Sequence, residues 1–143
     1  MARYLLDTNI VSYLVDRRAS AHGRVRDRLA ELADGDDVAV SILSLFELEH
    51  WLAVNDQHRP SVDGFLAEFT VEPLSRDGAM AFGELVRALR ARHGGASMKR
   101  AVIDCMIAAT AIVADRVLVS NDAVFVTLGV ADGRLRLDNW AAA

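Results

Sequence analysis

Short apolar runs alternate with longer, periodic segments along the chain. A short apolar run bounded by turn-forming or charged residues is typical of a strand buried in a sheet. Five runs fit this description, and the last of them alternates polar and apolar residues as an edge strand does. They predict strands over residues 3–6, 38–40, 69–71, 117–119 and 134–137.

The segments between these runs carry apolar residues at helical spacing. This periodicity predicts helices over residues 10–15, 25–33, 43–54, 79–91 and 101–113. Parallel strands joined by helices use right-handed crossovers, which place the helices over the faces of the sheet. The pattern therefore predicts an α/β fold with a mostly parallel five-stranded sheet and helices on both faces.

Length and composition narrow the class of protein. A chain of 143 residues, 52% of them hydrophobic, is long enough for one well-buried core, so we expect a single domain over residues 1–143. The single cysteine, Cys105, excludes an internal disulfide, and no Cys/His spacing predicts a zinc site. The first residues do not resemble a signal peptide, and charges interrupt every long apolar stretch. We expect a cytoplasmic protein with no membrane segment.

The net charge of −4 argues against broad attraction to nucleic acid, but the basic residues are unevenly distributed. Two segments contain arginines and no acid, one between Asp16 and Asp27 and the other between Glu84 and Asp104. Both are equally compatible with solvated helix faces and with phosphate contacts.

Polar side chains follow the predicted strands at their carboxyl ends. Asp7 follows the first strand, Ser41 follows the second, and Ser120, Asn121 and Asp122 follow the fourth. In parallel sheets, ligands bind at this edge. Asp7 could instead cap the helix that follows it, and Asp122 could be a turn residue.

Further acids interrupt predicted helices. Glu47 and Glu49 lie near the border of an apolar helix face, where either could be an amphipathic surface residue. Asp104 lies in a segment that is apolar all round, so its charge needs a partner, either an arginine or a metal ion. Asp104 is therefore the acid that a purely structural role explains least well.

Four carboxylates at one edge would repel each other strongly. Two charges about 4 Å apart repel by about 4 kcal/mol at an effective dielectric constant of about 20. A divalent cation reverses the sign of this interaction, and oxygen ligands favour Mg²⁺ or Mn²⁺. Because Mg²⁺ held by carboxylates accepts phosphate oxygens, the acids Asp7, Glu47, Asp104 and Asp122 point to phosphoryl chemistry.

Four motifs, LLDTNIV, SILSLFEL, IDCMIAATA and LVSNDAVF, occur in this order along nearly the whole chain. Together they resemble the PIN-domain nucleases, and more narrowly the VapC-like toxins of bacterial toxin-antitoxin pairs. In this resemblance Asp7, Glu47, Asp104 and Asp122 are the metal-binding and catalytic acids, and Ser44 is a matching hydroxyl position. Val124 departs from the pattern, since many relatives have an acid or histidine there.

The resemblance implies a Mg²⁺- or Mn²⁺-dependent endoribonuclease that a cognate VapB-like antitoxin inhibits, and implies a homodimer. Residues 52–69 could form the dimer interface, although core packing would also explain their aromatic side chains. Four polar residues could orient the acids or could equally cap the backbone: Thr8, Asn9, Ser120 and Asn121. Five arginines are candidate RNA phosphate contacts: Arg17, Arg18, Arg87, Arg90 and Arg92.

Two other enzyme or signalling classes share an acidic strand end. A haloacid-type phosphatase needs a second Asp two residues after the first, where this chain has Asn9. A response-regulator receiver needs an acceptor Asp after the third strand and a late lysine, and the only lysine is Lys99. A PIN-like module without catalysis, which binds RNA or protein, is the more serious alternative.

Overall fold

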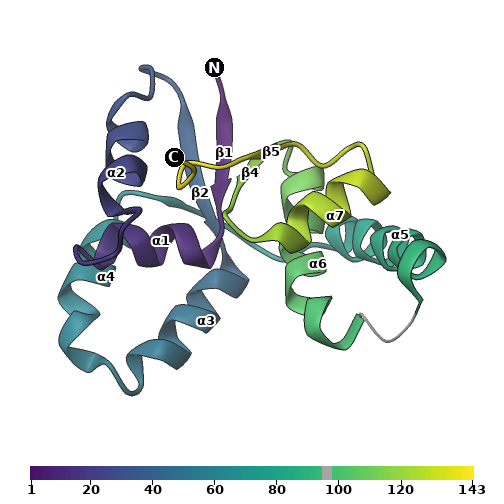
Figure 1. The fold of residues 1–143 in the computed structure, drawn as a ribbon, viewed down its shortest axis with the longest axis horizontal. Coiled ribbons are helices and arrows are strands. Elements are labelled where there is room, and N and C mark those ends of the chain that lie inside the picture. The colour runs from purple at the N-terminus through teal and green to yellow at the C-terminus, as the bar shows by residue number, and fades with distance from the viewer. Residues whose placement is uncertain (95–97) are drawn as a thin grey trace.

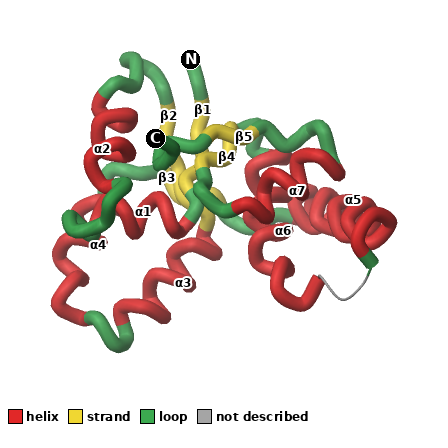
Figure 2. The backbone as a smooth tube through the Cα atoms, viewed as in Figure 1, coloured by secondary structure: helices red, strands yellow, loops and turns green. Residues whose placement is uncertain are grey.

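The computed structural model describes residues 1–94 and 98–143. Within them, five parallel strands form one sheet in the order β3-β2-β1-β4-β5 (Figures 1 and 2). The α/β prediction is confirmed, and the sheet is parallel throughout. The strands are β1 (Arg3–Leu6), β2 (Asp37–Ser41), β3 (Thr70–Glu72), β4 (Val117–Val119) and β5 (Leu137–Asp138).

The predicted helices are all present, with shifted ends, and two helices were not predicted. α4 and α7 occupy segments that the sequence left unassigned. The helices are α1 (Thr8–Val15), α2 (His22–Ala30), α3 (Ile42–Leu52), α4 (Arg59–Leu66), α5 (Arg76–His93), α6 (Met98–Val113) and α7 (Ala123–Ala131). A 3₁₀ turn over Asp56–His58 precedes α4.

The sheet separates two hydrophobic cores, and alternate residues of each strand enter opposite ones. In β1, Leu5 packs into the core under α5, α6 and α7, while Leu6 packs into the core under α1 to α4. Figure 1 shows the two helix groups on opposite sides of the sheet. The aromatic side chains of Phe65 and Phe69 pack against the second core, so they have the structural use that the sequence left open.

The last predicted strand, residues 134–137, is mostly wrong. β5 has only two residues, starting at Leu137, and Arg134 instead forms ion pairs with Asp132 and Glu84. The alternating pattern here reflects two loop arginines around the buried Leu135 rather than a strand.

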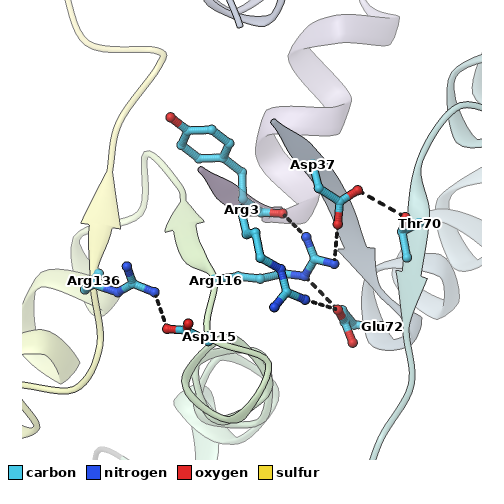
Figure 3. Close-up of polar contacts among 8 residues, drawn as sticks. Arg3, Asp37, Thr70, Glu72, Asp115, Arg116 and Arg136 are labelled. Atoms are coloured by element: carbon cyan, nitrogen blue, oxygen red, sulfur yellow. Dashed lines mark hydrogen bonds and ion pairs between the residues drawn. The ribbon is translucent and has the colours of Figure 1, made fainter. Parts of the chain in front are cut away.

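A buried arginine joins four strands of the sheet. Arg116 precedes β4 and is 3% exposed; its guanidinium bonds to Asp37 and Glu72, each at 2.6 Å, and to the carbonyl oxygen of Tyr4 at 3.3 Å (Figure 3). Because side chains alternate along strands, Arg116 and Asp37 lie on the face of the sheet that also carries Leu5. This network ties β1, β2, β3 and β4 together.

Within the described ranges, no helix has the length and apolar character needed to span a membrane.

Candidate functional site

Asp7 lies at the carboxyl end of the central strand β1. Its backbone N–H donates to the carbonyl of Val119 in β4 at 2.9 Å, which holds the residue at the sheet edge. Although Asp7 occupies the position before α1, its side chain makes no capping hydrogen bond. The carboxylate is 6% exposed and accepts a hydrogen bond of 2.8 Å from the Ser120 hydroxyl.

The environment of Asp7 disfavours its charged form. Burial raises the pKa of the Asp7 carboxyl above its usual value, and the charges of Glu47 and Asp122 raise it further, against the hydrogen bond from Ser120. The Asp7 carboxylate is therefore buried near other carboxylates, and no described cationic side chain offsets its charge. This is the situation that a bound cation would relieve.

Ser120 links two of the acids at this edge. Its hydroxyl donates to Asp7 and accepts a hydrogen bond of 3.0 Å from the backbone N–H of Asp122. Asp122 in turn caps α7, since its Oδ1 accepts from the N–H of Val124 at 3.0 Å. One carboxylate oxygen of Asp122 thus has a structural role, and the other is not engaged by any described residue.

Thr8 performs the corresponding role for Glu47 on α3. The Thr8 hydroxyl donates to Glu47 Oε1 at 2.8 Å and lies 3.0 Å from the buried hydroxyl of Ser44. The sequence motif matched Ser44 without indicating its role. Its contact with Thr8 places Ser44 beside the hydroxyl that bonds to Glu47. Glu49, the alternative to Glu47, is engaged by Arg59 at 2.6 and 3.2 Å and is not part of this arrangement.

Asp104 approaches the edge from α6. Burial raises the pKa of Asp104 to about 6, and nearby negative charges add to the effect. Those charges belong to Asp7, Asp122 and Glu47, so the other three predicted acids all lie close enough to Asp104 to raise its pKa. The helix is less enclosed than its apolar sequence suggested, because Val102 and Ile103 are 38% and 42% exposed.

The remaining predicted polar residues differ in their surroundings. Oδ1 of Asn9, in the first turn of α1, is buried and has no hydrogen-bond partner among the described residues. Asn121 makes no hydrogen bond to an acid; its amide instead contacts the Tyr13 hydroxyl at 3.3 Å and accepts from Asn139 at 2.9 Å.

The five arginines fall into two groups. Arg17 and Arg18 are exposed and line a cleft with Trp51 and His58, whose rings stack with centroids 5.0 Å apart. The second group lies in the second half of α5 and is also exposed. It consists of Arg87, Arg90 and Arg92.

The donor set fits a hard divalent cation. Carboxylate oxygens are the ligands that Mg²⁺ and Mn²⁺ favour, and the pKa values of the Asp7 and Asp104 carboxyls are raised by burial and by the nearby acids. The Asn9 amide oxygen is a further buried oxygen with no hydrogen-bond partner among the described residues. Among the described residues, no three acidic, histidine or cysteine side chains are already close enough to form a finished metal site. A cation bound among these carboxylates would offset the repulsion between their charges.

The parallel sheet has the strand order β3-β2-β1-β4-β5 and carries the candidate acids at its carboxyl edge. The family model for the PIN domain matches residues 4–130, so the chain belongs to the PIN domain family. The resemblance to PIN domains that the four sequence motifs indicated is therefore confirmed. Comparison with curated protein sequences gave no significant match.

Solved structures of similar fold come from bacterial toxin-antitoxin complexes. A chain of VapBC2 from Rickettsia felis, bound to a DNA fragment from its promoter, is 26% identical with a TM-score of 0.77, covering 96% of this chain and 98% of that one. A chain of VapBC-1 from nontypeable Haemophilus influenzae is 21% identical with a TM-score of 0.75, covering 98% and 99%. A chain of DNA-bound VapBC from Salmonella typhimurium is 23% identical with a TM-score of 0.73, covering 98% and 99%.

Proposed function

We propose that this protein is a Mg²⁺- or Mn²⁺-dependent endoribonuclease and the toxin of a cytoplasmic toxin-antitoxin pair. The observation that carries the proposal is the state of Asp104, whose pKa is raised to about 6 by burial and by three neighbouring acids. Such an arrangement lowers the stability of the fold in the absence of a cation. A purely structural role for Asp104 does not explain why the fold keeps this unfavourable charge, whereas a functional site does.

The proposed ligands are Asp7, Glu47, Asp104 and Asp122. A divalent cation bound there would lower the pKa of a water molecule and neutralise charge on the phosphate and the leaving oxygen. The chain's own residues orient the carboxylates: Ser120 fixes one oxygen of Asp7, and Thr8 fixes one oxygen of Glu47. Each hydroxyl leaves the second oxygen of its partner carboxylate available.

The proposed partners follow from the family and from the similar structures. Because VapBC complexes share this fold over nearly the whole chain, we propose a VapB-like antitoxin as the inhibitor. We also propose a homodimer as the assembly, which the resemblance to VapC-like toxins implies. RNA would be the substrate, with its phosphates contacted by the exposed arginines. Those are Arg17, Arg18, Arg87, Arg90 and Arg92.

The test is cleavage of RNA by the purified protein with Mg²⁺ or Mn²⁺ and with EDTA. We expect cleavage only with the metal, and a loss of at least about 100-fold in Asp7→Asn and Asp104→Asn, because each variant removes a charged ligand. Asp34→Asn is the matched control, since Asp34 is an exposed acid in the turn between α2 and β2.

Cleavage that persists in EDTA, or full activity in both site variants, would refute the catalytic assignment. RNA binding without cleavage in either metal would favour the alternative of a PIN-like binding module.

A further inference from the structure

A cleft adjoins the acidic edge on the side of α7 and β5. Its volume is about 490 Å³, and it shares Ser120 and Asp122 with the candidate metal site. Val126 on α7 and Leu137 on β5 line it with apolar surface and are 61% and 36% exposed. A substrate strand whose phosphate lay between the acids would therefore have this cleft directly beside it.

Two amide side chains line the same cleft. Asn139 donates to Asn121 Oδ1 at 2.9 Å, and Asn121 donates to the Tyr13 hydroxyl at 3.3 Å. Each amide nitrogen has two protons and uses one in these contacts, so each has a donor left for a ligand. Paired donors and acceptors beside an apolar wall match the edge and the face of a nucleobase.

The charges of the cleft decide which part of a nucleotide it accepts. Asp122 and Asp138 line it, and none of the described residues that line it is a lysine or an arginine. Asp138 is paired with Arg28, but Asp122 forms no ion pair with a described residue and would repel a phosphate, whereas it would not repel an uncharged aromatic ring. Arg28 and the Trp140 indole both bond to Asp138, at 3.2 and 3.0 Å, which holds this side of the cleft in place.

We propose that this cleft binds the nucleobase of the nucleotide next to the scissile phosphate and gives the enzyme a base preference at that position. The proposal rests on the proposed nuclease function. It assigns the contacts to the ring-binding surface of Val126 and Leu137 and to the amides of Asn121 and Asn139.

Val126→Trp tests the proposal, because a large side chain at this exposed position fills the cleft. Val130→Trp is the matched control, since Val130 lies one turn further along α7, is 62% exposed and does not line the cleft. Both proteins are incubated with Mn²⁺ and a pool of oligoribonucleotides of random sequence, and the cut ends are sequenced.

We expect Val126→Trp to lose the base preference at one position beside the cut and to cleave the best substrates about 10-fold more slowly, the scale of one lost base contact. Val130→Trp should keep both the preference and the rate. An unchanged preference in Val126→Trp would overturn the proposal, as would a uniform loss of rate at all sequences.

A second measurement does not depend on cleavage. Adenosine, cytidine, guanosine and uridine are titrated separately into metal-free, ¹⁵N-labelled protein, and the side-chain amide signals of Asn121 and Asn139 are followed. Saturable shifts of both signals, absent in Val126→Trp, support base binding even if the wild-type protein cleaves no RNA, in which case only the nuclease proposal fails. No shift with any of the four nucleosides would overturn the base-binding proposal.

Discussion

Replacing Asp104 with asparagine should make the metal-free protein more stable while making it inactive. The raised pKa of Asp104, about 6 instead of 3.8, corresponds to about 3 kcal/mol at 1.36 kcal/mol per pKa unit. Since Asp104 is only partly buried, solvent screening reduces this penalty to about 1–2 kcal/mol. In a chain of this length, that gain raises the melting temperature by about 3–6 °C.

The gain should depend on pH with a definite sign. Because the folded-state pKa of Asp104 lies above its unfolded-state value, the folded protein binds more protons between about pH 4 and pH 6. Its stability therefore falls as the pH rises through this window, and the full penalty is present at pH 7. Asp104→Asn should be more stable than the wild type at pH 7 and equal to it near pH 4.

Metal should reverse the order of stability. A cation at 100 times its dissociation constant stabilises the protein that binds it by about 2.7 kcal/mol. The wild type should gain this with Mg²⁺ or Mn²⁺, and Asp104→Asn should gain much less, so the two melting curves cross as metal is added.

The assay is thermal unfolding followed by circular dichroism in EDTA and across a metal titration, with Asp34→Asn as the control for loss of one exposed charge. The reasoning is refuted if Asp104→Asn is no more stable than the wild type at pH 7 in EDTA. It is also refuted if the gain is as large at pH 4.

Two further predictions concern the buried network and the linking hydroxyl. Arg116→Met should lower the free energy of unfolding by about 3 kcal/mol in urea, because it removes two ion pairs of a buried guanidinium and leaves Glu72 with only the 3.9 Å contact to Arg3. Arg136→Met, which breaks only an exposed pair, should cost less than about 1 kcal/mol. Equal losses in both variants would contradict this. Ser120→Ala should weaken Mn²⁺ binding about 10- to 100-fold by freeing Asp7, whereas Ser120→Thr should largely restore it; unchanged affinity in Ser120→Ala would show that the hydroxyl does not position the carboxylate.

The central strands could be predicted from the sequence because their side chains enter a core on both faces and therefore read as continuous apolar runs. α7 could not, since its sequence AVFVTLGVA is apolar on every side and rich in β-branched residues, so neither a helical nor a strand period stands out. Packing of Phe125 and Leu128 into the core selects the helix.

The four candidate acids could be selected from the sequence, but the hydrogen bonds that hold them could not be predicted. Asp104 stood out because a charge in an apolar helix needs an explanation. The contact between Thr8 and Glu47, by contrast, joins residues 39 positions apart, and nothing in either local sequence specifies it. The same holds for Arg116, whose partners lie on two other strands.

The strand order has a consequence for how the protein is made. β1 pairs with β4, so Tyr4 can pair only once Val117 has been made, and the backbone of Asp7 can bond only once Val119 has been made. During synthesis, every residue through Val119 must leave the ribosome before the first strand acquires this neighbour. The carboxylates of Asp7 and Asp122 can therefore come together only after all the elements from α1 to α6 have been made, and a nascent chain that ends before β4 cannot hold the assembled site.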